Sequence, residues 1–315
     1  MLVDFRIQRF NPDVDKAPHF EDYEIDLPQE ATVLEALMAI KEQKDGSLSF
    51  RASCRSAICG SCSVRINKCA RLACKTRVAN EMALFGSVTV EPLPKLTVIK
   101  DLVVDLEPFW SALRRVRPWL MPDPNERVPR RERLVEPDAQ LEAAIRDSLC
   151  ILCGACYADC NVIEVEKNFL GPAALARGHR HIVDSRDGMT DHRLKELSEP
   201  HGLWECARCF ACTEVCPKDV DPREAIRQIG EMAHRRRIAS DPGARHAQAF
   251  LDSTQRSGRV NEATLPYRTK GVGVIGMTPV AIKMLLKGKV PFPIQKPVAN
   301  IEEIRRLFQL TEGKE

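Results

Sequence analysis

The stretch CILCGACYADC, residues 150–160, decides the fold of this chain. It places four cysteines with gaps of two, two and three residues. The same spacing returns in CARCFACTEVC, residues 206–216, where Pro217 follows the last cysteine, whereas Asn161 follows the first run. Cysteines bunched in this way are more typical of metal binding in a reducing compartment than of a secreted disulfide framework.

The composition is that of an ordinary globular protein. The chain has 315 residues, of which 29% are charged and 44% apolar, with a net charge of +3 and 13 cysteines. This charge is too small to indicate a nucleic-acid partner. The N-terminus lacks a secretory signal pattern. No uninterrupted apolar run approaches the roughly 18 to 20 residues needed to cross a bilayer, so we expect a cytosolic protein that meets a membrane surface through a partner.

The N-terminal part, residues 1–105, predicts a small domain. Alternating apolar residues predict strands over 3–10 and 21–28, and helical spacing predicts a helix over 32–43 with Thr32 as its N-cap. Further strands are expected over 63–68 and 88–94. This order, with a cysteine loop between, predicts a β-grasp ferredoxin-like domain.

The remainder of the chain predicts helices, so the fold class is α+β. Proline and charge mark residues 106–137 as a linker, and residues 138–239 predict an all-α domain around the two cysteine runs. Asp221, Pro222 and Glu224 form a helix start signal after the second run. The C-terminal extension, residues 240–315, predicts helices over 278–289, with Thr278 as N-cap and Gly288 as stop, and over 300–310.

A first cysteine group lies in the N-terminal domain. Its spacing is four residues, then two, then a longer gap, which is close to the plant-type [2Fe-2S] pattern. A zinc site is the alternative, although zinc ribbons favour paired Cys-x2-Cys knuckles. Cys69, inside the longer gap, is interpreted as a bystander. The expected ligands are Cys54, Cys59, Cys62 and Cys74.

The two later runs each match the bacterial ferredoxin spacing, in which the fourth cysteine of a run ligates the other cluster. We therefore expect two interlocked cubane clusters, with zinc as a weaker alternative. One cluster would be held by Cys150, Cys153, Cys156 and Cys216, and the other by Cys160, Cys206, Cys209 and Cys212.

Three iron–sulfur clusters on a chain without a recognisable catalytic motif predict an electron relay. The sequence contains no GxGxxG motif, P-loop or nucleophile triad, so no catalytic residue and no substrate site are expected on this chain. His179 and His181 are interpreted as surface or interface residues. The basic runs at 114–117 and 234–237 are interpreted as solvated faces or contacts to an acidic partner.

At this point the chain resembles a known family, the iron–sulfur subunits of succinate dehydrogenases and fumarate reductases. The resemblance covers about residues 1–237 and is carried by both cysteine runs and by CRSAICGSCSVRIN, LTVIKDLVVDLEPFW, FLGPAALARGHRHIVDSRD and CTEVCPKDVDP. It implies an FAD-containing flavoprotein partner that oxidises succinate or reduces fumarate. Electrons would pass between FAD, the [2Fe-2S] cluster, a [4Fe-4S] cluster, the third cluster and quinone.

The departures from the family are informative. Most members lack cysteine at the position of Cys209 and hold a [3Fe-4S] cluster there, so the extra thiol favours a second [4Fe-4S] cluster. The residues that help to build the family's quinone pocket are replaced by Asn161, Val162, Glu164 and Ala207. No quinone ligand is therefore carried over to this chain.

These departures, with the extra tail, resemble the non-classical (type E) members, in which a subunit related to heterodisulfide reductase replaces the membrane cytochrome b. Residues 282–308 look similar to the tails of heterodisulfide reductase C-type proteins. The resemblance implies a peripheral protein on the cytoplasmic side of the cell membrane. The apolar face and flanking lysines of MTPVAIKMLL predict that the tail, residues 240–315, lies against the anchor or the membrane surface, with a helix packed on its own domain as the alternative. Two alternatives are a thiol-driven fumarate reductase or heterodisulfide-reductase-like subunit, and a stand-alone ferredoxin-like carrier.

Overall fold

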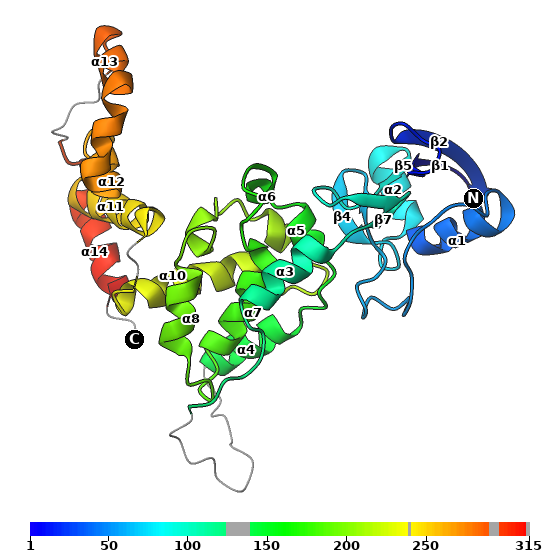
Figure 1. The fold of residues 1–315 in the computed structure, drawn as a ribbon, viewed down its shortest axis with the longest axis horizontal. Coiled ribbons are helices and arrows are strands. Elements are labelled where there is room, and N and C mark those ends of the chain that lie inside the picture. The colour runs from blue at the N-terminus through cyan, green and yellow to red at the C-terminus, as the bar shows by residue number, and fades with distance from the viewer. Residues whose placement is uncertain (124–138, 239–240, 290–295, 313–315) are drawn as a thin grey trace, which may run out of the picture. The chain divides into compact units, whose positions relative to one another are not determined.

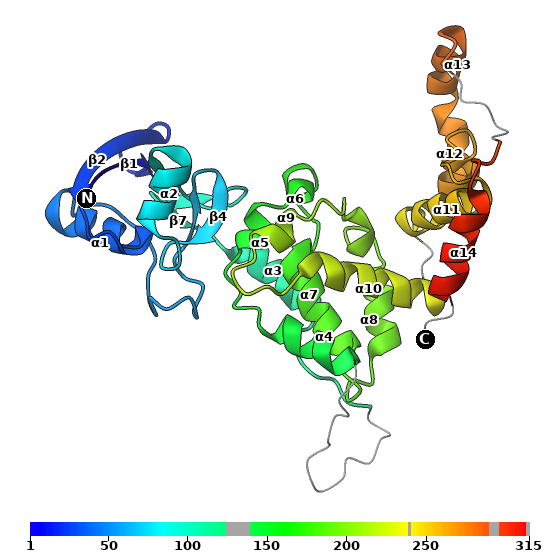
Figure 2. The ribbon, with the colours of Figure 1, turned by 180° about the vertical axis from the view of Figure 1, so that it is seen from behind.

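The computed structural model describes residues 1–123, 139–238, 241–289 and 296–312. These residues form two compact units (Figures 1 and 2). The first comprises Met1–Leu197 and His201–Met232, and the second comprises Ser198–Pro200 and Ala233–Glu315. The C-terminal part of the expected linker, from 124 to 137, lies outside the described residues.

The N-terminal domain is built on a mixed five-stranded sheet in the order β2-β1-β5-β3-β4. β1 runs antiparallel to β2 and parallel to β5, and β3 runs antiparallel to both β4 and β5. This architecture confirms the expected ferredoxin-like domain. The elements are β1 Leu2–Arg9, β2 His19–Asp26, α1 Val33–Gln43, β3 Ser63–Ile66, β4 Cys69–Leu72, α2 Val78–Phe85 and β5 Val88–Glu91, followed by the hairpin of β6 Val98–Lys100 and β7 Val103–Val104.

Local sequence explains why α1 begins where it does. Thr32 Oγ1 accepts a hydrogen bond from the Glu35 amide, and the Glu35 carboxylate accepts one from the Thr32 amide. This capping box satisfies amides that the first helical turn leaves without partners. The apolar face of α1, with Val33, Leu37 and Ile40, is buried in the core of the domain.

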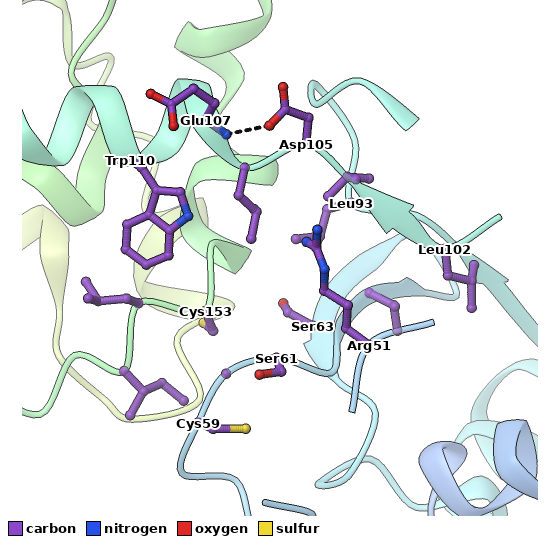
Figure 3. A pocket seen from close by; sticks show the side chains of 16 residues that line it. Arg51, Cys59, Ser61, Ser63, Leu93, Leu102, Asp105, Glu107, Trp110 and Cys153 are labelled. Carbon is purple, nitrogen blue, oxygen red and sulfur yellow. Dashed lines mark hydrogen bonds between the residues drawn. The ribbon is translucent and has the colours of Figure 1, made fainter. Parts of the chain in front are cut away.

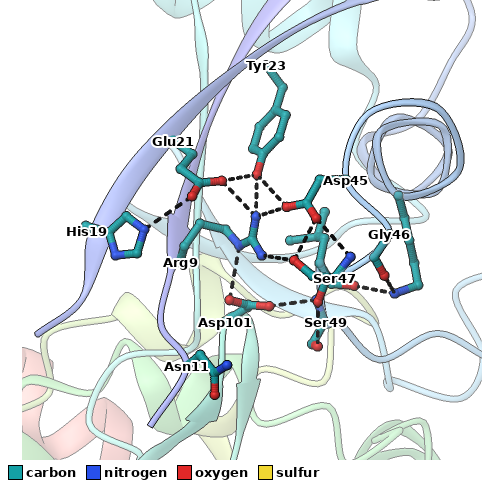
Figure 4. Close-up of polar contacts among 12 residues, drawn as sticks. Arg9, Asn11, His19, Glu21, Tyr23, Asp45, Gly46, Ser47, Ser49 and Asp101 are labelled. Carbon is teal, nitrogen blue, oxygen red and sulfur yellow. Dashed lines mark hydrogen bonds and ion pairs between the residues drawn. The ribbon is translucent and has the colours of Figure 1, made fainter. Parts of the chain in front are cut away.

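Arg9, at the end of β1, ties together the segments that lead into the cysteine loop (Figure 4). Its Nε donates to Asp101 at 3.1 Å, and its Nη2 donates to Ser47 at 2.9 Å. Its Nη1 also contacts the Asp45 carboxylate. Ser49 donates its amide to Asp101 at 2.8 Å, so the chain that enters the cysteine loop is held to the β6–β7 hairpin. Hydrogen bonds, first from Ser47 and also from Arg9, hold the pKa of Asp45 below its usual range.

The second part of the first unit is helical, as expected. Helix α3 lies within the span that was expected to be a linker. It is part of the folded helical domain instead, because its side chains Phe109, Ala112 and Leu113 are buried and it packs against α7. The elements are α3 Glu107–Arg115, α4 Ala139–Ser148, α5 Ala155–Ala158, α6 Asn161–Val165, α7 Gly171–Ile182, α8 Thr190–Leu197, η1 Leu203–Glu205, α9 Ala211–Glu214 and α10 Pro222–Arg235.

The second unit contains the C-terminal helices. Thr278 is the first residue of α13 rather than its N-cap, because the helical path continues into it from η2. The elements are α11 Pro242–Ser257, α12 Leu265–Lys270, η2 Gly271–Met277, α13 Thr278–Leu286 and α14 Ile301–Glu312.

The second unit contains a stretch that a search for an unbroken apolar run does not find. The helical stretch Leu265–Leu286 is 22 residues long, and by length and composition it is apolar enough to cross a bilayer. Three glycines, two prolines and three basic residues interrupt its strongly apolar residues. They hide the continuous helical path when the sequence is searched for an unbroken apolar run.

Candidate metal centres

The first cysteine loop points its backbone amides at its own sulfurs. Ile58 and Cys59 donate their amides to Cys54 Sγ, both at 3.3 Å. Ala57 donates its amide to Cys74 Sγ at 3.3 Å, which brings the distant fourth cysteine to the same loop. Amide donors aimed at sulfur stabilise thiolates and are one means of tuning an iron–sulfur cluster.

The thiols of this loop differ in their environments. Cys59 is exposed, and hydrogen bonds from Ser61 and from the Cys54 and Ser61 amides lower its pKa to about 6. Cys62 is buried in the domain core, and burial raises its pKa to about 12. One side of the loop therefore faces solvent while the other is shielded by the sheet.

The two later runs share one backbone conformation as well as one spacing. The first run has positive φ angles of 57° at Leu152 and 78° at Gly154. The second has 57° at Arg208 and 64° at Phe210, the matching positions. Each run then enters a four-residue helix, α5 or α9, and these helices pack against each other. The repeat in sequence is therefore a repeat in structure.

The first set of thiols combines the first run with the last cysteine of the second. Burial raises the pKa of Cys150, Cys153 and Cys156, and for each of them the nearby Cys216 thiol raises it further. The four line one cavity together with Pro217 and Val220. Val220 donates its amide to Cys216 Sγ at 3.4 Å.

The second set of thiols is the complementary one. Burial raises the pKa of Cys206 and Cys212, and the nearby Cys160 and Cys209 thiols raise both further. The amides of Val162 and Ile163, at the start of α6, hydrogen-bond to the Cys160 sulfur and oppose its upward pKa shift. Cys160 therefore lies with the second run, although it belongs to the first in sequence.

The first cysteine loop touches the first set directly (Figure 3). Gly60, with φ of +73°, approaches so closely that a Cβ there would lie 2.9 Å from both Cα and Cβ of Cys153. Lys75, next to Cys74, donates to the Pro217 carbonyl at 3.0 Å. A cavity of about 540 Å³, lined by Cys59, Trp110 and Cys153 among others, lies beside this contact.

Polar contacts join the sheet domain of the first unit to its helical domain. Asp159 accepts a hydrogen bond from the Ala70 amide on β4 at 3.0 Å. Lys95 donates to the Ala158 carbonyl at 2.7 Å. Both acceptors directly precede Cys160, so the sheet domain is fastened to the chain where the first run ends.

Comparison with known proteins supports this assembly of centres. A model of a 2Fe-2S iron-sulfur cluster binding domain matches residues 4–111, and one of a 4Fe-4S dicluster domain matches residues 147–220. The fumarate reductase iron-sulfur subunit of Mycobacterium tuberculosis is 42% identical over 222 residues, covering 70% of this chain and 89% of that protein. The chain belongs to the family of succinate dehydrogenase and fumarate reductase iron–sulfur subunits.

Other members of this family give the same result. The succinate dehydrogenase iron-sulfur subunit of Coxiella burnetii is 38% identical over 230 residues, covering 71% of this chain and 94% of its own. The 8-methylmenaquinol:fumarate reductase iron-sulfur subunit of Wolinella succinogenes is 34% identical and covers 82% of each chain. Among solved structures, a chain of the Mycobacterium smegmatis Sdh1 complex matches with a TM-score of 0.63 and 27% identity, over 75% of this chain and 97% of that one.

The donor sets fit the cofactors of the family. The [2Fe-2S] and [4Fe-4S] clusters are held by thiolate sulfurs, and the two matching domain models cover the segments that contain the twelve clustered cysteines. Among the described residues, no three His, Cys, Asp or Glu side chains converge closely enough to hold a single metal ion. Cys69 is the first residue of β4. Its interpretation as a bystander stays a prediction.

The prediction for the two histidines of α7 was wrong. His179 is fully buried, with its Nδ1 2.6 Å from the Asp147 carboxylate of α4, and His181 is 6% exposed. Burial lowers the pKa of His181 to about 4. The histidines of RGHRHI were expected at the surface, but both lie on the buried face of α7.

Two functional contacts were missing from the sequence interpretation. One is the approach of Gly60 to Cys153, which joins residues far apart in the chain. The other is Asn161, whose Nδ2 lies 3.8 Å from Cys209 Sγ. Asn161 had been singled out only for the proline it replaces, and the sequence carried no signal for its sulfur contact.

Proposed function

We propose that this chain transfers electrons within a succinate:quinone oxidoreductase, between the FAD of a flavoprotein subunit and a quinone. The observation that carries the proposal is the close approach of Gly60, beside the exposed Cys59, to Cys153, together with the packing of α5 against α9, the helices that carry Cys156 and Cys212. When bound, the iron–sulfur clusters would accept and release single electrons. The residues of this chain hold them close together and shield them from water.

The proposed ligands follow from the three sets of thiols. Cys54, Cys59, Cys62 and Cys74 would hold the [2Fe-2S] cluster. Cys150, Cys153, Cys156 and Cys216 would hold the middle [4Fe-4S] cluster, because Gly60 and Lys75 touch that set. Cys160, Cys206, Cys209 and Cys212 would hold the third. Four thiols there favour [4Fe-4S] over [3Fe-4S].

The exposed thiols indicate where the relay would begin and end. Cys59 is exposed at the first loop, and the exposed Ile58 beside it offers an apolar contact for the flavoprotein. At the third set, Cys209 and Phe210 are exposed, which suits delivery of electrons to an anchor subunit. The thiols of Cys156 and Cys212 are buried between these ends.

The remaining assignments are proposals of the same kind. The Wolinella relative, whose name joins a methylmenaquinol to fumarate, supports a quinone as the other redox partner. A heterodisulfide-reductase-related anchor is supported by the loss of the family's quinone-pocket residues and by the C-terminal extension. We place the complex on the cytoplasmic side of the cell membrane, with this chain as a peripheral subunit.

Replacement of Cys209 tests the assignment of the third cluster. Anaerobically prepared, oxidised wild-type protein should lack a dominant [3Fe-4S] signal in electron paramagnetic resonance. Cys209→Ser should convert the third cluster toward a three-iron form or make it labile. Cys69→Ser is the matched control and should leave iron content and spectrum unchanged.

Two results would contradict the proposal. A strong [3Fe-4S] signal in the wild-type protein would refute the eight-iron assignment for the helical domain. A stable, monomeric protein that binds no flavoprotein during purification would favour the ferredoxin-like carrier instead.

A further inference from the structure

The second unit exposes an apolar helical stretch that the electron-transfer function does not use. No residue of Leu265–Leu286 is buried. Val272 is 83% exposed, Ile275 73% and Leu286 81%. Soluble proteins seldom expose a contiguous apolar surface of this kind unless something covers it. An apolar hollow of about 590 Å³ runs along the same stretch and is lined by residues such as Tyr267, Ile275 and Met284.

The apolar side chains of α13 point in several directions. Val280, Ile282, Leu285 and Leu286 are each more than half exposed, and at about 100° per residue they lie on different sides of the helix. A helix with exposed apolar side chains on several sides needs apolar surroundings, which either protein or lipid can supply. The apolar distribution therefore indicates that the stretch is covered, and its charge indicates by what.

The charge of the stretch points to the kind of lipid. Residues 263–301 contain six basic residues and no Asp or Glu, although the whole chain has a net charge of only +3. Arg268 is paired with Asp252 on α11. Lys283, Lys287 and Lys289 are exposed at the C-terminal end of α13. Clustered lysines beside an apolar helix are attracted to anionic lipid headgroups.

The attachments at both ends of the stretch exclude a membrane crossing. At its start, Arg245 on α11 donates to the Thr269 carbonyl at 2.9 Å. Beyond its end, Val298 donates its amide to the Ser257 carbonyl, also on α11, at 3.0 Å. The nine residues from Lys289 to Val298 reach at most about 30 Å, roughly the thickness of the hydrocarbon core. A crossing helix would need a return path through the hydrocarbon core within these nine residues, at the limit of their reach and with backbone groups that lipid cannot satisfy.

We propose that residues 271–289 dock this chain directly onto a membrane surface rich in anionic lipid. Side chains such as Val272, Ile275 and Leu286 enter the outer part of the acyl region. Lys283, Lys287 and Lys289 reach the phosphates. Both ends of the stretch stay on the side of the membrane where α11 lies. This inference rests on the second unit alone and does not depend on the proposed electron transfer.

Vesicle binding by the full, cluster-containing chain tests the proposal. The protein should sediment with vesicles of phosphatidylglycerol and phosphatidylcholine, and much less with phosphatidylcholine alone. At about fivefold per lysine, the triple change Lys283→Gln, Lys287→Gln and Lys289→Gln should weaken anionic binding about 100-fold. Ile275→Asp with Leu285→Asp should abolish binding to both. Leu84→Asp, at a 70% exposed site in the first unit, is the matched control and should bind as wild type.

Three results would overturn the proposal. Equal binding to both vesicle types, unaffected by the lysine changes, would remove the role of anionic lipid. Failure of the wild-type chain to bind vesicles unless an anchor subunit is present would make the stretch a protein-docking surface. Resistance of the vesicle-bound chain to alkaline carbonate extraction would show a spanning segment instead of a surface one.

Discussion

The contact between Gly60 and Cys153 gives the sharpest test of the proposed relay, through the variant Gly60→Ala. Two costs follow from the structure. Alanine at a φ of +73° loses about 1 to 2 kcal/mol because its Cβ crowds the backbone. The new Cβ would also lie 2.9 Å from Cα and Cβ of Cys153, whereas carbon atoms prefer about 3.5 to 4.0 Å. The two domains must therefore separate by about 0.6 to 1.1 Å at this point.

Gly86→Ala is the matched control for this variant. Gly86 has the same φ of +73°, but nothing lies within 4 Å of its Cβ position. Both variants should lose about 1 to 2 kcal/mol of stability from the backbone strain they share. Only Gly60→Ala should in addition disturb the approach of the first cysteine loop to the middle set of thiols.

Rapid mixing measures the consequence. The protein is mixed with a reductant under anaerobic conditions, and the arrival of electrons at the cubane clusters is followed by freeze-quench electron paramagnetic resonance. Electron tunnelling falls steeply with distance, so Gly60→Ala should slow this arrival while Gly86→Ala should not. If both variants relay electrons at the wild-type rate with full iron content, the Gly60 contact is not on the electron path.

Three further predictions concern stability, each measured by thermal unfolding of the cluster-containing protein. Arg193→Leu should cost about 3 to 5 kcal/mol because it leaves the buried Asp187 carboxylate without its cation, and adding Asp187→Leu should recover part of the loss. Burial lowers the pKa of His181 from 6.5 to about 4, so the folded chain binds a proton less readily than the unfolded chain and stability falls as pH drops below 6.5. That fall is about 1.4 kcal/mol per pH unit, and His181→Leu should flatten it between pH 6.5 and 5.5. Phe210→Gly should relieve about 1 to 2 kcal/mol of left-handed strain and lose about 0.5 to 1 kcal/mol from the stacked Arg223, for a slight net gain; a clear loss would contradict this estimate.

The parts of the structure that were predictable are those governed by short-range rules. The capping box of Thr32 and Glu35 depends on two side chains three residues apart. Likewise, Asp221 accepts a hydrogen bond from the Glu224 amide at the start of α10, as its helix start signal predicts. The grouping of the thiols into two interlocked cubane sites rests on a spacing rule and stays a prediction.

The parts that were not predictable depend on packing between segments far apart in the chain, or on whether an apolar helix is covered by other residues. Helix α3 follows a strand and precedes proline-rich sequence, and only its burial against α7 shows that it belongs to the helical domain. The inner position of His179 depends on Asp147, in a different helix. The exposure of residues 265–286 was equally hidden, because sequence alone does not show whether an apolar helix is covered.

The position of Cys216 among the thiols of the first run has a consequence for how the protein is made. On a ribosome the first run leaves the exit tunnel before the second, and 56 residues separate Cys160 from Cys216. At about 5 to 20 residues per second, translation needs about 3 to 11 s to supply the missing ligand. During this interval the nascent chain carries free thiols that can be oxidised, and neither cubane has its full ligand set. Cluster loading of the helical domain should therefore be completed only after the second run has emerged, and a chain truncated before residue 206 should mature at neither centre.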